Sequence, residues 1–278
     1  MTISVYVTHY KFINLLKLQY ERIKRFCKED IEYIVINNGV DKSFVNMVTD
    51  ICKELNLKEI KINHSNNRIL YTAIDHKTAL QYCYDNYISK DPADIRIVMD
   101  SDIIPFSTFS FIEMLGDSDI AGIKMYVKNN IYIASFISIF NKNVDFTNLN
   151  LDKNIEFDSG FGMTNLVLKH KTNFLKHTAP MQEKEAAYVF RNMEVDKVKP
   201  YNPNFWIQFI NGSLLHYYRG SSWDSGDMDF YKKKTEFIEF FLENENLYNI
   251  YLDDNVNYDL AHMDSWLDKE NYFKRLIF

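Results

Sequence analysis

The chain has 278 residues, of which 46% are hydrophobic and 15% aromatic, so it is long enough and apolar enough to fold around one large core. Its formal net charge of -6 argues against nucleic acid as the main partner, because contacts to a phosphate backbone need clustered Lys and Arg. A nucleotide is still compatible with this charge, since a few local groups and a divalent cation can hold its phosphates.

The cysteines and the apolar segments indicate the compartment. Cys27, Cys52 and Cys83 each fall in a helix-like segment without zinc-like spacing, so we expect buried thiols in a reducing environment. No apolar stretch reaches the roughly 18–20 residues that a membrane helix needs, and no cationic stretch followed by an apolar run opens the sequence. We therefore expect a cytoplasmic protein, in a bacterium or in the cytosol of a virus-infected cell.

The amino-terminal part alternates between strand-like and helix-like patterns. Strands are predicted over residues 3–7, 31–36, 60–62 and 94–99, and amphipathic helices over residues 12–27, 44–55 and 71–88. This alternation is typical of a parallel sheet with helices on both faces and right-handed crossovers. Because ligands bind beyond the carboxyl ends of such strands, residues 8–10, 37–38 and 100–102 are the segments in which to look for a site.

The pattern changes after the fourth strand. Two strands over residues 119–126 and 131–140 are predicted to form a hairpin, and a glycine-containing loop follows at 158–162. The remaining predicted elements are a helix at about 183–193, an apolar strand-like segment at 205–215 and a helical tail from 227 onward.

Two carboxylates follow the fourth predicted strand directly. Asp100 and Asp102 flank Ser101, so both side chains can face one point, where they repel each other unless a cation lies between them. Hard oxygen ligands of this kind suit Mg²⁺ or Mn²⁺, which also neutralises a diphosphate. The alternative is a solvated turn in which Asp102 or Ser107 caps a helix, but the apolar strand and its place in the βα series favour the metal site.

Four segments resemble, in the same order, motifs of the GT-A class of glycosyltransferases. They are residues 34–39, 75–80, 97–102 and 216–223, and the resemblance extends from residue 1 to about 225. The third is similar to the DXD motif, and the fourth to a late histidine-containing motif of bacterial and large-DNA-virus members. The resemblance implies an α/β fold with a Rossmann-like, mostly parallel sheet flanked by helices. It also implies metal-dependent transfer of a sugar from a nucleotide diphosphate donor to a carbohydrate acceptor or another hydroxyl.

The resemblance also implies a domain arrangement and a nucleotide. We predict a catalytic domain over 1–225, with a nucleotide-binding half over 1–106 and an acceptor-side half over 107–225, and a helical extension over 226–278 packed on it. UDP is the nucleotide implied by the class. However, Asn37 stands where many members have Asp, so GDP and dTDP remain open.

The site residues carried over by resemblance fall into two groups. The metal ligands are expected to be Asp100, Asp102 and His216. The residues expected to bind the nucleotide sugar are Thr8, Tyr10, Asn37, Arg68, His76, Asp100, Ser101, Arg219, Ser221 and Ser222. Arg219 suits a phosphate through its planar fork of donors. Packing roles for Tyr10 and His76 and a surface role for Arg68 are the alternatives.

A catalytic base is expected on the acceptor side. In inverting transfer one carboxylate accepts the proton of the acceptor hydroxyl, and Asp158, before a Ser-Gly-Phe-Gly turn, is the candidate. Asp158 can instead begin that turn through its own side chain. Asp224 and Asp227 are the competing candidates, although either can cap the tail helix.

Two other functions are compatible with parts of this pattern. A nucleotidyltransferase acting on sugar phosphates shares the βα architecture and metal-binding acids, but residues 8–12 lack the glycine-rich loop expected after its first strand. A non-catalytic glycan-binding protein would not need the set of Asp100, Asp102 and His216. The sequence leaves the sugar, the acceptor, the stereochemistry and the oligomeric state open.

Overall fold

The computed structural model describes residues 1–9, 13–39, 42–62, 72–127, 130–151, 159–177, 208–216 and 242. The predicted helix at 183–193 and most of the predicted extension over 226–278 lie outside these residues. None of the helices in the described part of the chain is long and apolar enough to cross a membrane.

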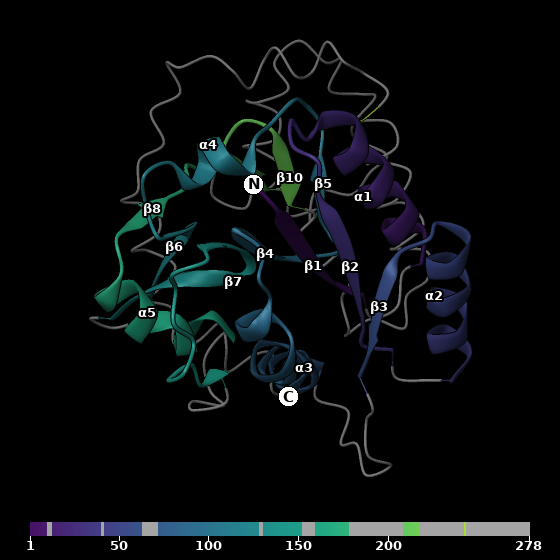
Figure 1. The fold of residues 1–278 in the computed structure, drawn as a ribbon, viewed down its shortest axis with the longest axis horizontal. Coiled ribbons are helices and arrows are strands. Elements are labelled where there is room, and N and C mark those ends of the chain that lie inside the picture. The colour runs from purple at the N-terminus through teal and green to yellow at the C-terminus, as the bar shows by residue number, and fades with distance from the viewer. Residues whose placement is uncertain are drawn as a thin grey trace, which may run out of the picture.

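A seven-stranded sheet forms the centre of the fold (Figure 1). Its strands are β1 (Ile3–His9), β2 (Glu32–Asn37), β3 (Lys58–Lys61), β4 (Ile95–Asp100), β6 (Ile120–Val127), β7 (Asn130–Asn141) and β8 (Thr172–Phe174). They lie in the order β3-β2-β1-β4-β7-β6-β8, and the first four are parallel to one another. β7 runs antiparallel to both β4 and β6, which confirms the predicted hairpin, and β8 is parallel to β6.

Helices cover both faces of this sheet. They are α1 (Ile13–Phe26), α2 (Lys42–Glu54), α3 (Thr72–Asn86), α4 (Phe111–Leu115) and α5 (Thr164–Lys169), with short 3-10 turns η1 (Ile88–Lys90) and η3 (Ser159–Met163). One core cluster contains Leu16 of α1, Val48 of α2 and Met114 of α4, and the other contains Leu80 of α3 and Leu166 of α5. The predicted α/β class, a mostly parallel sheet flanked by helices, is therefore confirmed (Figure 1).

A second, three-stranded sheet lies beyond the end of β4. It contains β5 (Ile103–Pro105), β9 (Gln208–Ile210) and β10 (Leu214–His216) in the order β5-β10-β9. The sequence predicts one strand-like segment over 205–215, whereas the structure has a tight hairpin there. Asn211 and Gly212 make the turn with φ values of 51° and 70°, which an Asn-Gly pair adopts readily. This small sheet brings His216 opposite Ile103, three residues after Asp100.

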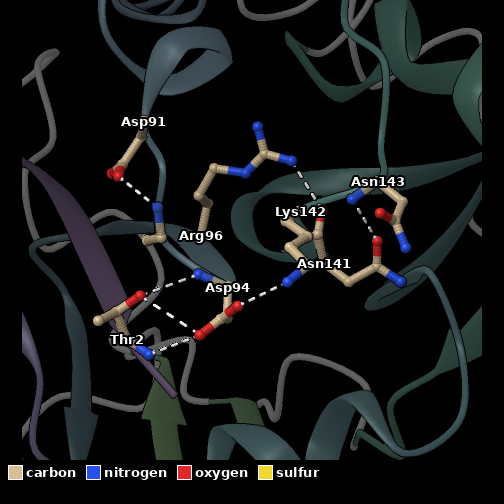
Figure 2. A network of polar contacts seen from close by, with 8 residues as sticks. Thr2, Asp91, Asp94, Arg96, Asn141, Lys142 and Asn143 are labelled. Carbon is tan, nitrogen blue, oxygen red and sulfur yellow. Dashed lines mark hydrogen bonds and ion pairs between the residues drawn. The ribbon is translucent and has the colours of Figure 1, made fainter.

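Polar contacts fasten the amino-terminal ends of β1 and β4 to the end of β7 (Figure 2). The backbone N–H of Thr2 donates to Asp94 Oδ2 at 2.9 Å, and Lys142 Nζ donates to Asp94 Oδ1 at 3.0 Å. The buried Arg96 donates to the carbonyl of Asn141 at 2.7 Å. Because β1 and β4 are parallel, this network fixes the edge of the sheet opposite to the one at which Asp100 lies.

The three cysteines are free thiols, as expected. Cys52 and Cys83 are buried and Cys27 is partly exposed. Burial raises the pKa of each thiol to about 12. Since the thiolate is the reactive form, these cysteines are packing residues and not nucleophiles.

Candidate active site

The turn after β4 carries both predicted metal-binding carboxylates. Asp100 is the last residue of β4, and Ser101 and Asp102 connect it to β5, which begins at Ile103. The N–H of Ser101 donates to the carbonyl of Thr8 at 3.3 Å, so the turn continues the pairing of β4 with β1. Asp102 is only 3% exposed, which excludes the solvated-turn interpretation for this residue.

Each carboxylate of the turn faces a histidine from a distant part of the chain. His76 Nε2 of α3 lies 3.0 Å from Asp100 Oδ1, and His216 Nε2 of β10 lies 3.6 Å from Asp102 Oδ1. The side chains of His216 and Asp102 are 5% and 4% exposed, whereas that of Asp100 is 20% exposed. The structure thus brings together four of the predicted site residues as two acid–histidine pairs.

His216 is held from two sides. Its ring stacks on Phe136 of β7 with the centroids 4.2 Å apart, and its Nδ1 lies 3.0 Å from Gln208 Oε1. The Nε2 of Gln208 lies 3.0 Å from His177 Nδ1. In this amide orientation Gln208 Oε1 accepts the Nδ1–H of His216, so the lone pair of His216 Nε2 is directed to the Asp102 side.

The carboxylate of Asp102 and the imidazole of His216 are chemically suited to bind a divalent cation. The Nε2 lone pair and a carboxylate oxygen are both acceptors, so their approach to 3.6 Å is favourable only with a proton or a cation between them. Carboxylate oxygens suit both Mg²⁺ and Mn²⁺, and an imidazole nitrogen beside them favours Mn²⁺, the softer of the two. In the part of the chain that the structure describes, no three His, Cys, Asp or Glu side chains converge into a complete metal site. Asp100 contacts His76 instead of joining Asp102 and His216.

Buried polar atoms gather where β1 and β2 end, beside the turn. Thr8 Oγ1 and both amide atoms of Asn38 are buried, and none of them has a hydrogen-bond partner among the residues that the structure describes. Thr8 pairs in register with Asp100 and with Ile36, which places these atoms next to the carboxylate turn. Leaving a buried polar group unsatisfied costs about 1–3 kcal/mol, so this edge is suited to a ligand that carries its own donors and acceptors.

Asn37 and Asn38 have different environments. Asn37 Nδ2 donates to the Val45 carbonyl at 3.0 Å and to Glu59 Oε1 at 2.7 Å, and Asn37 Oδ1 accepts from Gly39 N at 3.3 Å. The side chain of Asn37, which the resemblance assigns to nucleotide-sugar binding, is therefore hydrogen-bonded within the protein and joins β2 to α2 and β3. Asn38 is the amide with unused hydrogen-bonding capacity. It lies in the segment 37–38 that the sequence predicts to border a site, because it follows directly after a strand, although it is not among the residues predicted to bind the nucleotide sugar.

His9 gives the carboxyl end of β1 a pH-dependent stability. Burial lowers the pKa of His9 to about 3, although the nearby Asp100 carboxylate raises it. An unfolded histidine has a pKa of about 6.5, so neutral His9 lowers the stability of the fold at no pH above about 6.5. As the pH falls from there toward 3, the free energy of unfolding decreases by about 1.4 kcal/mol per pH unit, because the unfolded chain binds a proton that the folded chain does not.

We expect the metal-free protein to unfold at lower urea concentrations as the pH falls from 7 to 5. His9→Gln should flatten this dependence, and identical pH slopes for the two proteins would contradict the assignment.

Six predicted site residues lie outside the described part of the chain. They are Tyr10, Arg68, Asp158, Arg219, Ser221 and Ser222. Their roles remain predictions, whereas Thr8, Asn37, His76, Asp100, Ser101, Asp102 and His216 all lie at the carboxyl edge of the sheet or in contact with it.

No family model and no curated protein sequence matches the chain. Among solved structures it is similar to mannosyltransferase PcManGT from Pyrobaculum calidifontis in complex with GDP-Man and Mn²⁺, with 12% identity, 62% of this chain and 54% of that chain covered and a TM-score of 0.44. It is also similar to S. aureus TarS 1-349 (15%, 63% and 58% covered, 0.41) and to the glycosyltransferase GlyE of Streptococcus pneumoniae (11%, 87% and 64% covered, 0.41).

The matched region spans little more than half of the mannosyltransferase and of TarS 1-349. With identities of 11% to 15% and TM-scores of 0.41 to 0.44, these likenesses are distant.

Proposed function

We propose that the protein is a metal-dependent glycosyltransferase that moves a sugar from a nucleoside diphosphate sugar to a hydroxyl of a glycan acceptor. One observation carries the proposal: a buried carboxylate–imidazole pair, Asp102 and His216, lies beside unsatisfied polar atoms of Thr8 and Asn38. Such an edge can hold a cation and a nucleoside at once, which is what a nucleoside diphosphate sugar requires. The resemblance of residues 97–102 to the DXD motif supports this reading.

The proposed roles follow from the positions and from the resemblance. Asp102 and His216 hold Mn²⁺ or Mg²⁺ with Asp100, which His76 holds through its 3.0 Å contact. The cation, when bound, offsets the negative charge that develops on the departing diphosphate. Thr8 and Asn38 bind the nucleoside, for which UDP is proposed. Of the remaining predicted residues, Tyr10 and Arg68 are proposed at the nucleotide and Arg219, Ser221 and Ser222 at the diphosphate.

Asp158 is proposed as the base that accepts the proton of the acceptor hydroxyl. In η3, Gly160 packs so closely on β7 that an added Cβ would overlap the carbonyl oxygen of Ile133. β7 is antiparallel to β4 and pairs Ile137 with Met99, so Ile133 lies on the carboxyl side of β4. This packing places Gly160, two residues after Asp158, on the carboxyl side of β4, which supports a role for Asp158 on the acceptor side.

Asp158→Asn should separate binding from turnover. The variant removes a proton acceptor and leaves the ligands of the donor intact, so donor affinity should change by less than about five-fold while turnover falls by on the order of 10²–10⁴. Titration calorimetry with donor and Mn²⁺, together with turnover assays, measures both quantities. Asp224→Asn and Asp227→Asn are the matched comparison variants. If one of them loses turnover while Asp158→Asn keeps normal turnover, the base is that residue and not Asp158. Retention of the donor's anomeric configuration in the product would remove the need for this base.

The identity of the released product tests the proposed reaction. Incubation with UDP-sugars, Mn²⁺ and a panel of glycan acceptors should release UDP, and chelation of the metal should stop the release. A nucleotidyltransferase would instead consume a nucleoside triphosphate and a sugar 1-phosphate and release pyrophosphate. A glycan-binding protein would bind acceptors and release neither product.

A further inference from the structure

A buried glutamine of α1 contacts the backbone on both sides of the carboxylate turn. Gln19 is 0% exposed, and its Nε2 lies 2.8 Å from the carbonyl oxygen of Asp100 and 2.7 Å from that of Ile103. These two carbonyls bracket Ser101 and Asp102. One amide group therefore fixes both ends of the segment that presents the carboxylates.

The orientation of this amide is set by a second contact. Both hydrogens of Gln19 Nε2 are donated to the two carbonyls, so Gln19 Oε1 must accept, and the Tyr33 hydroxyl donates to it at 2.6 Å. The Tyr33 oxygen in turn lies 3.3 Å from His9 Nε2. With its own hydrogen given to Gln19, that oxygen accepts from His9, which therefore carries its proton on Nε2. The direction of every hydrogen bond from His9 to the turn follows from this sequence of contacts.

This chain of contacts is separate from the ligands themselves. Gln19 and Tyr33 belong to α1 and β2 and reach the turn through its backbone, whereas His76 and His216 reach it through the carboxylates. Asp102 lies inside the bracketed segment, so a shift of either carbonyl moves its side chain relative to His216. Residues behind a metal ligand commonly change metal affinity or activity by about 10–100-fold when they are replaced.

We propose that Gln19, oriented by Tyr33, is a positioning residue that holds the Asp100–Asp102 turn in its metal-binding conformation. The proposal rests on the proposed function, since it assigns a role in the same metal site. Gln19 touches neither donor nor acceptor in this role. It acts through the two carbonyls, and Tyr33 acts only through Gln19.

Gln19→Met tests the role because it retains the length of the side chain and removes both donors. The Mn²⁺ affinity of the full chain in the presence of UDP should fall by about 10–100-fold, measured by electron paramagnetic resonance of free Mn²⁺. Tyr33→Phe should lower it in the same direction by a smaller factor, because it removes only the hydroxyl. The double variant should bind Mn²⁺ no more weakly than Gln19→Met alone, since Tyr33 acts through the same amide.

Leu16→Val is the matched control for a merely structural effect. Leu16 is 0% exposed on the same helix, one turn from Gln19, and it packs in the core with an apolar side chain that has no hydrogen to donate to the turn carbonyls. The control should lower the melting temperature and leave Mn²⁺ affinity unchanged. Equal Mn²⁺ affinity for Gln19→Met, Tyr33→Phe and the control would overturn the positioning role, and Tyr33→Phe decides alone if Gln19→Met does not fold. Failure of the wild-type chain to bind Mn²⁺ with UDP would contradict the proposed function, and the positioning role with it.

Discussion

Asp102→Asn should reduce sugar transfer by about 10²–10³-fold and abolish Mn²⁺-dependent nucleotide binding. The substitution retains the size of the side chain but removes its charge at a position that is 3% exposed and lies 3.6 Å from His216 Nε2. In the proposed site Asp100 is already a ligand and contacts His76, so it cannot supply the second negative charge that the substitution removes. Turnover assays and calorimetry with UDP and Mn²⁺ measure both effects.

The control for this variant is Asp50→Asn. Asp50 is an exposed carboxylate of α2 whose side chain is 75% exposed, so the same chemical change there should alter neither transfer nor metal binding. Circular dichroism should show that both variants remain folded. Near-normal transfer by Asp102→Asn would contradict the assignment of Asp102 to the metal.

His216→Gln should weaken Mn²⁺ binding by about 10–100-fold and remove nitrogen from the metal's coordination sphere. Because Gln208 Oε1 holds Nδ1 at 3.0 Å, Nε2 is the nitrogen expected to coordinate, at roughly 2.0–2.3 Å. Pulsed electron paramagnetic resonance of the wild-type Mn²⁺ complex should show coupling to an imidazole nitrogen, and the variant should lack it.

His170→Gln is the matched control for this measurement. His170 lies after α5, with its Nδ1 3.5 Å from Asp119 Oδ2, and no site role is assigned to it. The nitrogen coupling should be unchanged in this variant. Imidazole coupling that persists in His216→Gln, or that is absent from the wild type, would show that His216 is not a ligand.

The parallel part of the fold could be predicted because its evidence is local. The apolar periodicity of residues 3–7 and 31–36 predicts strands, and β1 and β2 follow at Ile3–His9 and Glu32–Asn37. The hairpin of β9 and β10 was not predicted because its apolar residues form a nearly continuous run. The Asn211-Gly212 pair that divides the run was the available signal.

The site could be predicted only in part, because its contacts join segments far apart in the chain. Asp102 meets His216 through the pairing of β5 with β10, which no periodicity reveals, so resemblance alone had connected them. Gln19 occupies a helix position that sequence patterns assign to packing, and its contacts to two carbonyls appear only once α1 is placed on the sheet. Asn37 and Asn38 are adjacent residues of the same type, so the sequence does not show which of the two amides is hydrogen-bonded within the protein. In the structure it is Asn37, whose Nδ2 donates to Glu59 Oε1.

A crystal structure of the protein with a UDP-sugar and Mn²⁺ tests the central claim most directly. We expect the metal to lie between Asp102 and His216 Nε2 and to contact the diphosphate, with the nucleoside against Thr8 and Asn38. Binding of the nucleotide away from the carboxyl ends of β1, β2 and β4, or a metal held without Asp102 and His216, would contradict the account.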